Sequence, residues 1–452
     1  MNPASGLSAG LLQTLRSHEA TLWCNPAYGE ATVPPLADDS GTPAQAAQRM
    51  ARHAAVLARV FPELAADAGR VRSPLLPVDG LREALLPGRA DAGTWLLKAD
   101  HDLPVAGSVK ARGGFHEVLS LAERLLHEQC GAQAGDPASG GPAAGALPAL
   151  DSAAARALFA RYTVAVGSTG NLGLGIGLIS RALGFRAVVH MSADAKQWKK
   201  DRLRNHGIDV IEHAGDYARA VQAGREQAEA DPYGYFVDDE HSAALFMGYA
   251  ASADELAEQL AAAGRPVDAT HPLFVYLPCG VGGAPGGILY GLKQRFGRHV
   301  HGFFAEPAAS PCMLVQLASG SDTPLSVYDV GLDNRTEADG LAVGLASPLV
   351  APLMRGLLAG VFTVRDDRLF RDAALLNAAH GALIEPSAAA GFAGPEWLTT
   401  SAAGREFVAR HGLADALADA THVLWSTGGS LVPAAEHAIF QARGRALLGQ
   451  PA

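Results

Sequence analysis

The segment GVGGAPGG at 280–287 is the clearest chemical signal in the sequence. It follows an apolar stretch, PLFVYLP at 272–278, which predicts a buried strand, and it precedes a predicted helix that begins near Gly287. Successive backbone N–H groups in such a turn point toward one spot, and the positive end of a helix dipole adds to them. The segment therefore predicts a cradle for a phosphate group rather than an ordinary tight turn. It is not a Walker A loop, because Ile288 and Leu289 stand where that loop has Lys and Ser or Thr.

A second glycine-bearing segment, GSTGNLGLG at 167–175, also joins a predicted strand, 163–167, to a predicted helix. Its glycines do not have the G-x-G-x-x-G spacing of a dinucleotide-binding turn. Instead, Ser168, Thr169 and Asn171 place hydroxyl and amide groups beside backbone N–H groups that a helix start leaves free. These groups suit a carboxylate or a phenolate oxygen. A simple capped helix start is the alternative interpretation.

The residues beside Lys110 favour a reactive role for its amino group. Lys110 stands in SVKARGG at 108–114, beside Arg112 and two glycines. A lysine next to another cation, or in a dry pocket, has a lowered pKa and can form a Schiff base with a carbonyl group. Because most lysines are solvated surface groups, this segment alone is a weak indication.

Hydroxyl groups also follow the last predicted strand, in THVLWSTGG at 421–429. A hydroxyl at the carboxyl end of a strand, such as that of Thr427, can bond a ring nitrogen. The same residues could equally form an ordinary turn.

A basic cluster occupies MSADAKQWKKDRLRNHG at 191–207, where a helix is predicted over Asp194–Asn205. Charge alone favours a solvated helix face. We assign this segment no chemistry from its composition.

These segments are positioned by strands that alternate with helices. Such alternation predicts βαβ units and a mainly parallel sheet. In sheets of this kind ligands bind at the carboxyl ends of the strands, where the three glycine-bearing turns are expected to meet. The predicted strands are 163–167, 186–191, 208–213, 235–237, 272–278, 299–306 and 421–429. Residues 1–92 contain helices and turns with no chemical signal.

Composition narrows the class of protein. The 452 residues include 36 Lys and Arg against 46 Asp and Glu, a net charge of −10, which argues against nucleic-acid binding. Four widely spaced cysteines are typical of a reducing cytoplasm. The N-terminal residues lack the pattern of a signal peptide, and no apolar run is long enough to span a membrane. A soluble cytoplasmic protein without membrane or nucleic-acid partners is expected.

A phosphate cradle, a Schiff-base lysine, a carboxylate loop and a terminal hydroxyl together describe a pyridoxal-phosphate site. The chain resembles the D-serine dehydratase family among the fold type II, tryptophan-synthase-β-like enzymes. SVKARGG and VHMSADAK (189–196) are typical of the D-serine branch. The matching stretches follow the family's order: WCNPAY (23–28), KADHDLPVAGSVKARGG (98–114), VGSTGNLGLGIGLISRALGF (166–185), VHMSADAKQWKKDRLRNHG (189–207), VYLPCGVGGAPGG (275–287), GLDNRTEADGLAVG (331–344), IEPSAAAG (384–391) and WSTGG (425–429).

The resemblance implies a role for each matched position. Lys110 would carry the cofactor as a Schiff base and transfer a proton. Asn171 would bond the phenolic oxygen of the cofactor, and Thr427 would face its pyridine nitrogen. Thr169 would help to protonate the leaving hydroxyl. The residues expected to hold the substrate carboxylate are Ser168, Thr169 and Gly170. The residues expected to cradle the phosphate through main-chain N–H groups are Gly280, Val281, Gly282, Gly283 and Ala284.

The resemblance also implies an activity, the conversion of D-serine to pyruvate and ammonia and of D-threonine to 2-oxobutanoate. It suggests a monovalent cation such as K⁺ near Glu306 or Glu385, and a monomer, with a dimer as the alternative. Two positions depart from the family, Ala284 where Gly is usual and Ala106 where Ser is usual. A methyl group at position 284 is tolerated only if that residue avoids positive φ.

Proteins with the same fold have other functions, which are alternatives for this chain. An L-serine or L-threonine dehydratase and a β-replacement enzyme share its cofactor chemistry, and the preference for D over L substrates rests on the resemblance alone. An amino-acid-binding sensor is the alternative from another class, although it would not need Lys110.

The expected domain organisation also follows the resemblance. Residues 1–92 form an N-terminal extension that packs on a large cofactor-binding domain, made of 93–159 and 246–452. The Ala-, Gly- and Pro-rich stretch 131–150 is expected to be a flexible connection. Residues 160–245 form a small mobile domain that carries the carboxylate loop. Its hinges are expected just before Thr163 and near Gly248.

Overall fold

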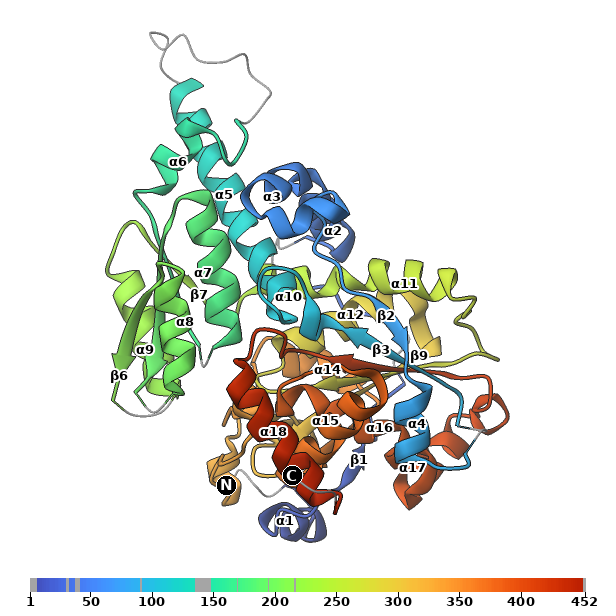
Figure 1. Cartoon of the computed structure of the whole chain (residues 1–452). Helices are drawn as coiled ribbons and strands as arrows, with labels where there is room; N and C mark the ends of the chain where they lie inside the picture. The colour runs from blue at the N-terminus through green and yellow to red at the C-terminus, as the bar shows by residue number, and fades with distance from the viewer. Residues whose placement is uncertain are drawn as a thin grey trace.

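The computed structural model contains two mainly parallel sheets, each covered by helices (Figure 1). The described residues are 6–29, 32–36, 41–89, 92–134, 148–168, 170–193, 195–214 and 217–449. The predicted α/β architecture with mainly parallel sheets is therefore confirmed. None of the helices in these ranges is long and apolar enough to cross a membrane.

The larger sheet has seven strands in the order β1-β10-β9-β8-β11-β3-β2. Its five central strands run parallel, and the two edge strands β1 and β2 are antiparallel to their neighbours. The central strands are buried on both faces, which explains their continuous apolar sequences. The strands are β1 (Leu22–Cys24), β2 (Leu75–Pro77), β3 (Thr94–Ala99), β8 (Leu273–Pro278), β9 (Val300–Pro307), β10 (Gly360–Val364) and β11 (Thr421–Ser426).

Alternate side chains of the central strands enter two different hydrophobic clusters. Val275 and Leu277 of β8 belong to the first cluster, and Phe274 and Tyr276 belong to the second. The helices outside the smaller sheet's unit that contribute to the first cluster are α1 (Ala9–Arg16), α2 (Pro43–Arg52), α3 (Ala54–Val60), α5 (Lys110–Ala134), α10 (Ala243–Ala250), α11 (Ser252–Ala262), α12 (Gly283–Phe296), α13 (Cys312–Ser319) and α14 (Val350–Leu357).

The second cluster lies on the opposite face of the large sheet. Its helices are α4 (Asp79–Leu85), α15 (Asp366–His380), α16 (Gly394–Thr400), α17 (Ala402–Arg410) and a 3-10 helix, Pro386–Ala393. The last helix, α18 (Ala434–Leu447), packs on α15. The remaining 3-10 helices are Pro62–Asp67, Asp100–Asp102, Gly297–His299, Val327–Val330, Asp339–Leu341 and Ala414–Ala416.

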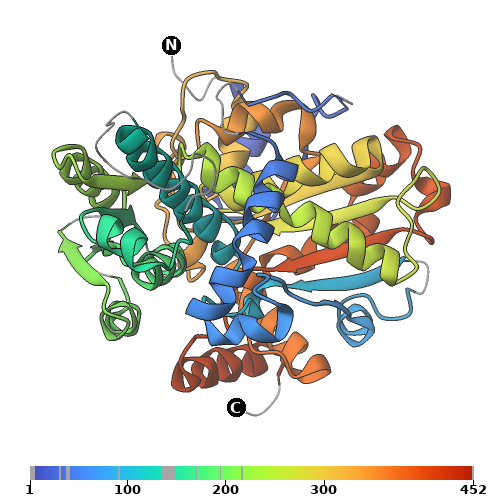
Figure 2. The same ribbon diagram turned by 90° about the horizontal axis from the view of Figure 1, so that it is seen from above.

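The smaller sheet has four parallel strands in the order β6-β5-β4-β7 and stands to one side of the larger sheet (green in Figure 1). Helix α5 contacts both α7 of this unit and α10 of the large one, and lies between the two sheets (Figure 2). The elements are α6 (Ala153–Phe159), β4 (Thr163–Gly167), α7 (Asn171–Leu183), β5 (Arg186–Ser192), α8 (Gln197–Asn205), β6 (Asp209–His213), α9 (Tyr217–Glu229) and β7 (Gly234–Val237).

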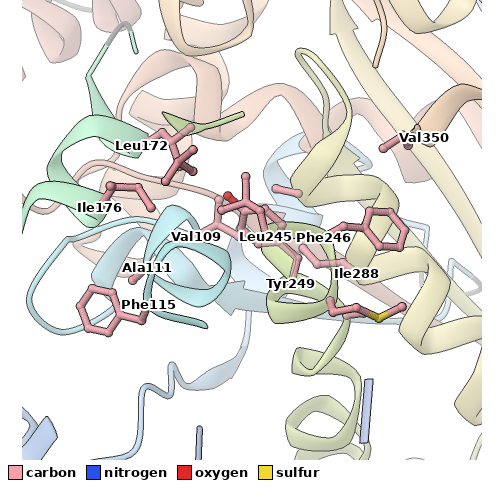
Figure 3. Packing of buried hydrophobic residues seen from close by; sticks show 14 of the residues in the cluster. Val109, Ala111, Phe115, Leu172, Ile176, Leu245, Phe246, Tyr249, Ile288 and Val350 are labelled. Atoms are coloured by element: carbon pink, nitrogen blue, oxygen red, sulfur yellow. The ribbon is translucent and has the colours of Figure 1, made fainter. Parts of the chain in front are cut away.

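Apolar side chains join the unit built on the smaller sheet to the unit built on the larger sheet, around the start of helix α5. Val109, Ala111 and Phe115 pack with side chains of α7, α10, α12 and α14 in one continuous cluster (Figure 3). This packing fixes where the chain around Lys110 lies, because protein interiors are close-packed and resist displacement.

Several predicted boundaries differ from the structure. The first ninety-two residues also supply the two edge strands β1 and β2, which are too short to show a pattern in the sequence. Strands β3 and β10 of the large sheet were not predicted either. Helix α12 begins at Gly283, four residues before the predicted start. Helix α8 begins at Gln197 with Lys196 at its N-cap, and Asp194, the predicted cap, lies outside the described residues. Of the segment 131–150, residues up to Ala134 continue helix α5, and 135–147 lie outside the described ranges.

Candidate active site

A cavity lies where strands β4, β8 and β11 end. Its volume, including the open space at its mouth, is about 880 Å³. Residues from all the predicted motifs line it, and they include Lys110, Ser168, Asn171, Thr427 and the whole segment Gly280–Ala284. The three glycine-bearing turns therefore meet at one place. Two of them follow strands of the large sheet, and the third follows β4 of the small sheet. Thr169 lies outside the residues that the structure describes.

The glycine-rich turn forms the N-terminus of helix α12. Gly282 is the N-cap residue, with φ of 109°, and no side chain caps the helix. The first-turn N–H groups have no acceptor within the helix, so they remain available to an anion. A Cβ atom at Gly282 would lie 2.6 Å from Cε of Met313. Ala284 lies inside the first turn and is not among the described residues with positive φ, so its methyl group is tolerated.

Lys110 begins helix α5, and its side chain reaches the cavity with one-fifth of its surface exposed. Its Nζ lies 3.0 Å from Oδ2 of Asp239. Asp239 is the second residue after the end of strand β7. The other carboxylate oxygen of Asp239 is buried and has no hydrogen-bond partner in the described part of the chain. Sequence reasoning missed Asp239. A carboxylate just after the end of a parallel strand was the available signal.

Arg112 does not act on Lys110 as the sequence suggested. Its guanidinium donates two hydrogen bonds to Asp100 and further bonds to Glu255, all within a buried network. Its charge is therefore neutralised by two carboxylates. Burial would raise the pKa of Glu255, but Arg112 and Lys98 outweigh burial and lower that pKa to about 2. This cluster holds the start of α5 in place rather than tuning the lysine.

Ser168 organises the loop that was expected to hold a carboxylate. Its Oγ accepts N–H bonds from Gly170 at 3.0 Å and from Gly173 at 2.9 Å, and the side chain is buried. The hydroxyl proton remains available for donation toward the cavity. Gly170 has φ of 156°, and a Cβ atom there would lie 2.9 Å from Cδ of Lys199. Only glycine fits this position without displacing the lysine.

Asn171 is held by a buried carboxylate. Its Nδ2 donates to Oε1 of Glu385 at 2.8 Å, and Gly428 lies so close that a Cβ atom there would be 2.4 Å from the same oxygen. Burial raises the pKa of Glu385, although the charge of Lys199 acts in the opposite direction. Glu385 was predicted as a possible cation ligand, and in the structure it orients Asn171.

Thr427 follows strand β11 at the wall of the cavity. Its main-chain oxygen accepts the N–H of Val109 at 2.8 Å, and Ser108 forms a bridge with Gly428. The end of β11 is thus tied to the residue before Lys110. Thr427 and Lys110 both line the cavity.

Glu306 lies behind the glycine-rich turn rather than in the cavity. It is fully buried and accepts N–H bonds from Met313 at 2.8 Å and Leu314 at 2.9 Å, so it caps helix α13. The thiol of Cys312 contacts both Glu306 and the main-chain oxygen of Gly280. Burial raises the pKa of Glu306 to about 8, despite these hydrogen bonds.

The basic segment of helix α8 is less solvated than its composition indicated. Lys199 and Lys200 are both buried. Lys199 lines the cavity, and its Nζ lies 2.6 Å from Oδ2 of Asp339 in the large unit. The expectation of a wholly solvated face is wrong here, because long-range ion pairs draw these lysines inward.

The sequence comparisons identify the protein family. Residues 67–406 match the family described as pyridoxal-phosphate dependent enzymes. The chain belongs to this family. A protein of Cupriavidus pinatubonensis named "Probable D-serine dehydratase" is 58% identical over 445 residues, 98% of this chain and 97% of that protein. A protein of Burkholderia thailandensis with the same name is 59% identical over 439 residues, 97% of this chain and 95% of that protein.

Solved structures support the same fold. Escherichia coli diaminopropionate ammonia lyase, in complex with D-serine, has a TM-score of 0.68 at 19% identity, and the match covers 94% of this chain and 97% of that chain. Serine racemase from Dictyostelium discoideum has a TM-score of 0.59 at 18% identity, covering 87% and 100%. At these identities the likeness establishes the fold class, which agrees with the predicted fold type II.

The residues around the cavity fit pyridoxal phosphate. The uncapped N-terminus of α12 suits the phosphate, and Lys110 lies in the same cavity with its Nζ available for a Schiff base. The first turn of α12 is closely packed, since a Cβ at Gly286 would lie 2.4 Å from Cγ1 of Val350. The cofactor predicted from the sequence is therefore the one that the family and the cavity support.

Proposed function

We propose that the chain is a D-serine ammonia-lyase that converts D-serine to pyruvate and ammonia, and D-threonine to 2-oxobutanoate. The observation that carries this proposal is the cavity itself, which is lined by Lys110, by Ser168 and Asn171 of the proposed carboxylate loop, and by the uncapped turn Gly280–Ala284. Relatives that are 58–59% identical over nearly the whole chain, and are named for this activity, support the same substrate.

Each lining residue has a proposed role toward the cofactor. Lys110 holds it covalently through Nζ, and the amide of Asn171 bonds its phenolic oxygen. Thr427 faces the pyridine nitrogen with a neutral hydroxyl, which does not keep a proton on that nitrogen as a carboxylate would. The main-chain N–H groups of Gly280, Val281, Gly282, Gly283 and Ala284 bind the phosphate.

When bound, pyridoxal phosphate stabilises the negative charge that develops at the α-carbon of an amino acid. The protein's part is to move protons and to fix the substrate. Nζ of Lys110 would be freed when the substrate's amino group takes its place, and would then accept the α-proton. Asp239, 3.0 Å away, would hold the resulting ammonium in place. Ser168, Thr169 and Gly170 bind the carboxylate. Thr169 protonates the leaving hydroxyl, and the cofactor phosphate is the alternative donor.

Glu306 is the better of the two predicted positions for a monovalent cation such as K⁺. Among the described contacts its partners are main-chain N–H groups and the Cys312 thiol, with no cationic side chain. Glu385 is already engaged by Asn171 and lies near Lys199. We expect K⁺ to raise the activity over Na⁺, and Glu306→Gln to remove this dependence while Glu385→Gln retains it. Retained dependence in Glu306→Gln would place the cation elsewhere.

Residues 160–245 are proposed to move as a small domain that closes over the substrate. The carboxylate loop lies on this unit, whereas Lys110 and the phosphate cradle belong to the other. We place the second hinge at 238–242 rather than at Gly248, because a Cβ atom at Gly248 would lie 2.6 Å from His116 in a tightly packed helix pair. D-Alanine should slow hydrogen exchange in 165–195. Protection confined to the phosphate cradle would contradict closure.

The deciding experiment is pyruvate or 2-oxobutanoate release by the protein incubated with pyridoxal phosphate and D-serine, L-serine or D-threonine. We expect D-serine to have the highest kcat/KM and D-threonine to be a second substrate. A comparable kcat/KM for L-serine would assign the chain to the L-serine or L-threonine dehydratases. Binding of D-alanine without release from any substrate would favour an amino-acid sensor. A cytoplasmic monomer is proposed, and its mass in solution is measurable by light scattering.

A further inference from the structure

Lys199 is a second cation at the edge of the cavity, and the proposed mechanism does not use it. It comes from helix α8 of the small sheet, and only 7% of its side chain is exposed. The cationic side chains that line the described cavity are Lys110 and Lys199. Lys110 is committed to the cofactor under the proposed function. Lys199 is thus the cation that remains for an anionic part of the substrate.

The ammonium group lies against the carboxylate loop. The position that a Cβ atom of Gly170 would take is 3.3 Å from Nζ of Lys199 and 2.9 Å from its Cδ. A side chain at position 170 would therefore displace the lysine. The glycine keeps the loop backbone and the lysine in contact, so that a carboxylate bound by the loop meets Nζ as well.

The same ammonium group is paired across the molecule. Nζ lies 2.6 Å from Oδ2 of Asp339, which starts the 3-10 helix Asp339–Leu341 of the large unit. One-third of the Asp339 side chain is exposed. An ammonium group has three donors, so it can bind Asp339 and a substrate carboxylate together. Gly340 and Leu341, which follow Asp339, also line the cavity.

Neighbouring side chains hold the start of α8 against the large unit. Trp198 packs on a small cluster formed by Phe370, Val432 and Phe440 of the C-terminal region. The ammonium of Lys196 lies 5.5 Å from the centre of the Phe440 ring. These contacts limit the directions that Lys199 can take, which favours a fixed binding role over a mobile surface charge.

We infer that Lys199 binds the α-carboxylate of the substrate, and that Asp339 positions Lys199 and thereby couples substrate binding to the approach of the two units. This inference rests on the proposed function. It requires an amino acid with a free carboxylate, because an amide or alcohol in its place offers Lys199 no charge.

The test compares binding of D-alanine and D-alaninamide to the holoenzyme by calorimetry, alongside kcat and KM for D-serine. Lys199→Met should weaken D-alanine binding and raise KM by about 10- to 100-fold, because a charge-assisted hydrogen bond is lost. We expect kcat and D-alaninamide binding to change less than threefold. Lys199→Arg should restore part of the affinity, and Asp339→Asn should raise KM less than Lys199→Met does.

Lys200→Met is the matched control. Its ammonium pairs with Glu212 and the carbonyl of Ala193, inside the small sheet, so KM should not change. Equal losses for D-alanine and D-alaninamide in Lys199→Met would show a structural role and overturn the inference, as would an unchanged KM. Binding of both D-alanine and L-alanine to the holoenzyme is measured by the same calorimetry. A wild-type protein that binds D-alanine but releases no pyruvate from D-serine contradicts the proposed function, and the binding comparison with Lys199→Met still decides the role of Lys199.

Discussion

Substitutions at Gly282 should separate the backbone requirement of the phosphate cradle from its charge. Gly282 has φ of 109° and caps helix α12, with space for a Cβ atom limited by Met313. Positive φ costs other residues about 1–2 kcal/mol. The free loop can relax away from this conformation, but the phosphate-bound loop cannot. We therefore expect Gly282→Ala to weaken cofactor binding by about 5- to 30-fold.

Gly282→Asp adds a negative charge at the position where the phosphate is expected. Two unit charges 4 Å apart repel by about 4 kcal/mol at an effective dielectric constant of about 20. An aspartate at the N-cap also accepts the N–H bonds that the phosphate would use. We expect a further loss of about a thousandfold relative to Gly282→Ala. High salt should reduce the difference, because screening weakens the repulsion.

The assay is titration of the apoprotein with pyridoxal phosphate, followed by absorbance at low and high ionic strength. Gly10→Ala is the control, because no atom lies within 4 Å of the added Cβ. Circular dichroism verifies that each variant is folded. Equal dissociation constants for Gly282→Ala and Gly282→Asp would mean that no anion binds at this helix end, and the assigned cradle would be wrong.

Three further outcomes are expected. Borohydride reduction and peptide mapping should label Lys110, and Lys110→Ala should abolish pyruvate release; label at another lysine would refute the assignment. Gly428→Ala should lower kcat/KM about tenfold or more, because the added Cβ would lie 2.4 Å from Oε1 of Glu385 and displace the carboxylate from its hydrogen bond with Asn171. Unchanged kinetics would contradict the role of Glu385 in orienting Asn171. The lowered pKa of Glu255 stabilises the fold above about pH 4.5, and this contribution is lost as the pH falls toward 2. Glu255→Gln should therefore have a lower Tm than the wild type at pH 7 and a smaller decrease in Tm on acidification. An equally steep decrease in the variant would argue against the ion pairs with Arg112.

The four strands of the small sheet and β8, β9 and β11 of the large sheet were predicted from their apolar runs, which burial on two faces leaves in the sequence. Strands β3 and β10 of the large sheet were missed, although both are buried. The meeting of the turns after β8 and β11 was also predictable, since neighbouring parallel strands of one sheet present their carboxyl ends at one edge. The turn after β4 belongs to the other sheet, so this rule does not explain its approach to the same cavity. Strands β1 and β2 were not predictable, because three residues at a sheet edge carry no pattern. Their pairing depends on neighbours that are distant in the sequence.

Charge pairing was the part of the site that the sequence did not reveal. Lys110 and Asp239 are 129 residues apart, and Lys199 and Asp339 are 140 apart. Local composition describes each of these groups as a free charge, and only the folded chain determines its partner. The interpretation of Arg112 failed for the same reason, since adjacency in the sequence did not mean adjacency of the charged groups.

The position of β11 has a consequence for how the protein is made. The last strand of the chain lies between β3 and β8, and its end anchors Val109 beside Lys110. More than four hundred residues must therefore leave the ribosome before that lysine acquires its final surroundings. A chain that ends before β11 lacks this anchor beside Lys110, and it retains the unpaired edges of β3 and β8, which promote aggregation. Completion of the surroundings of Lys110 is thus a late step, after the residues of β11 have been synthesised.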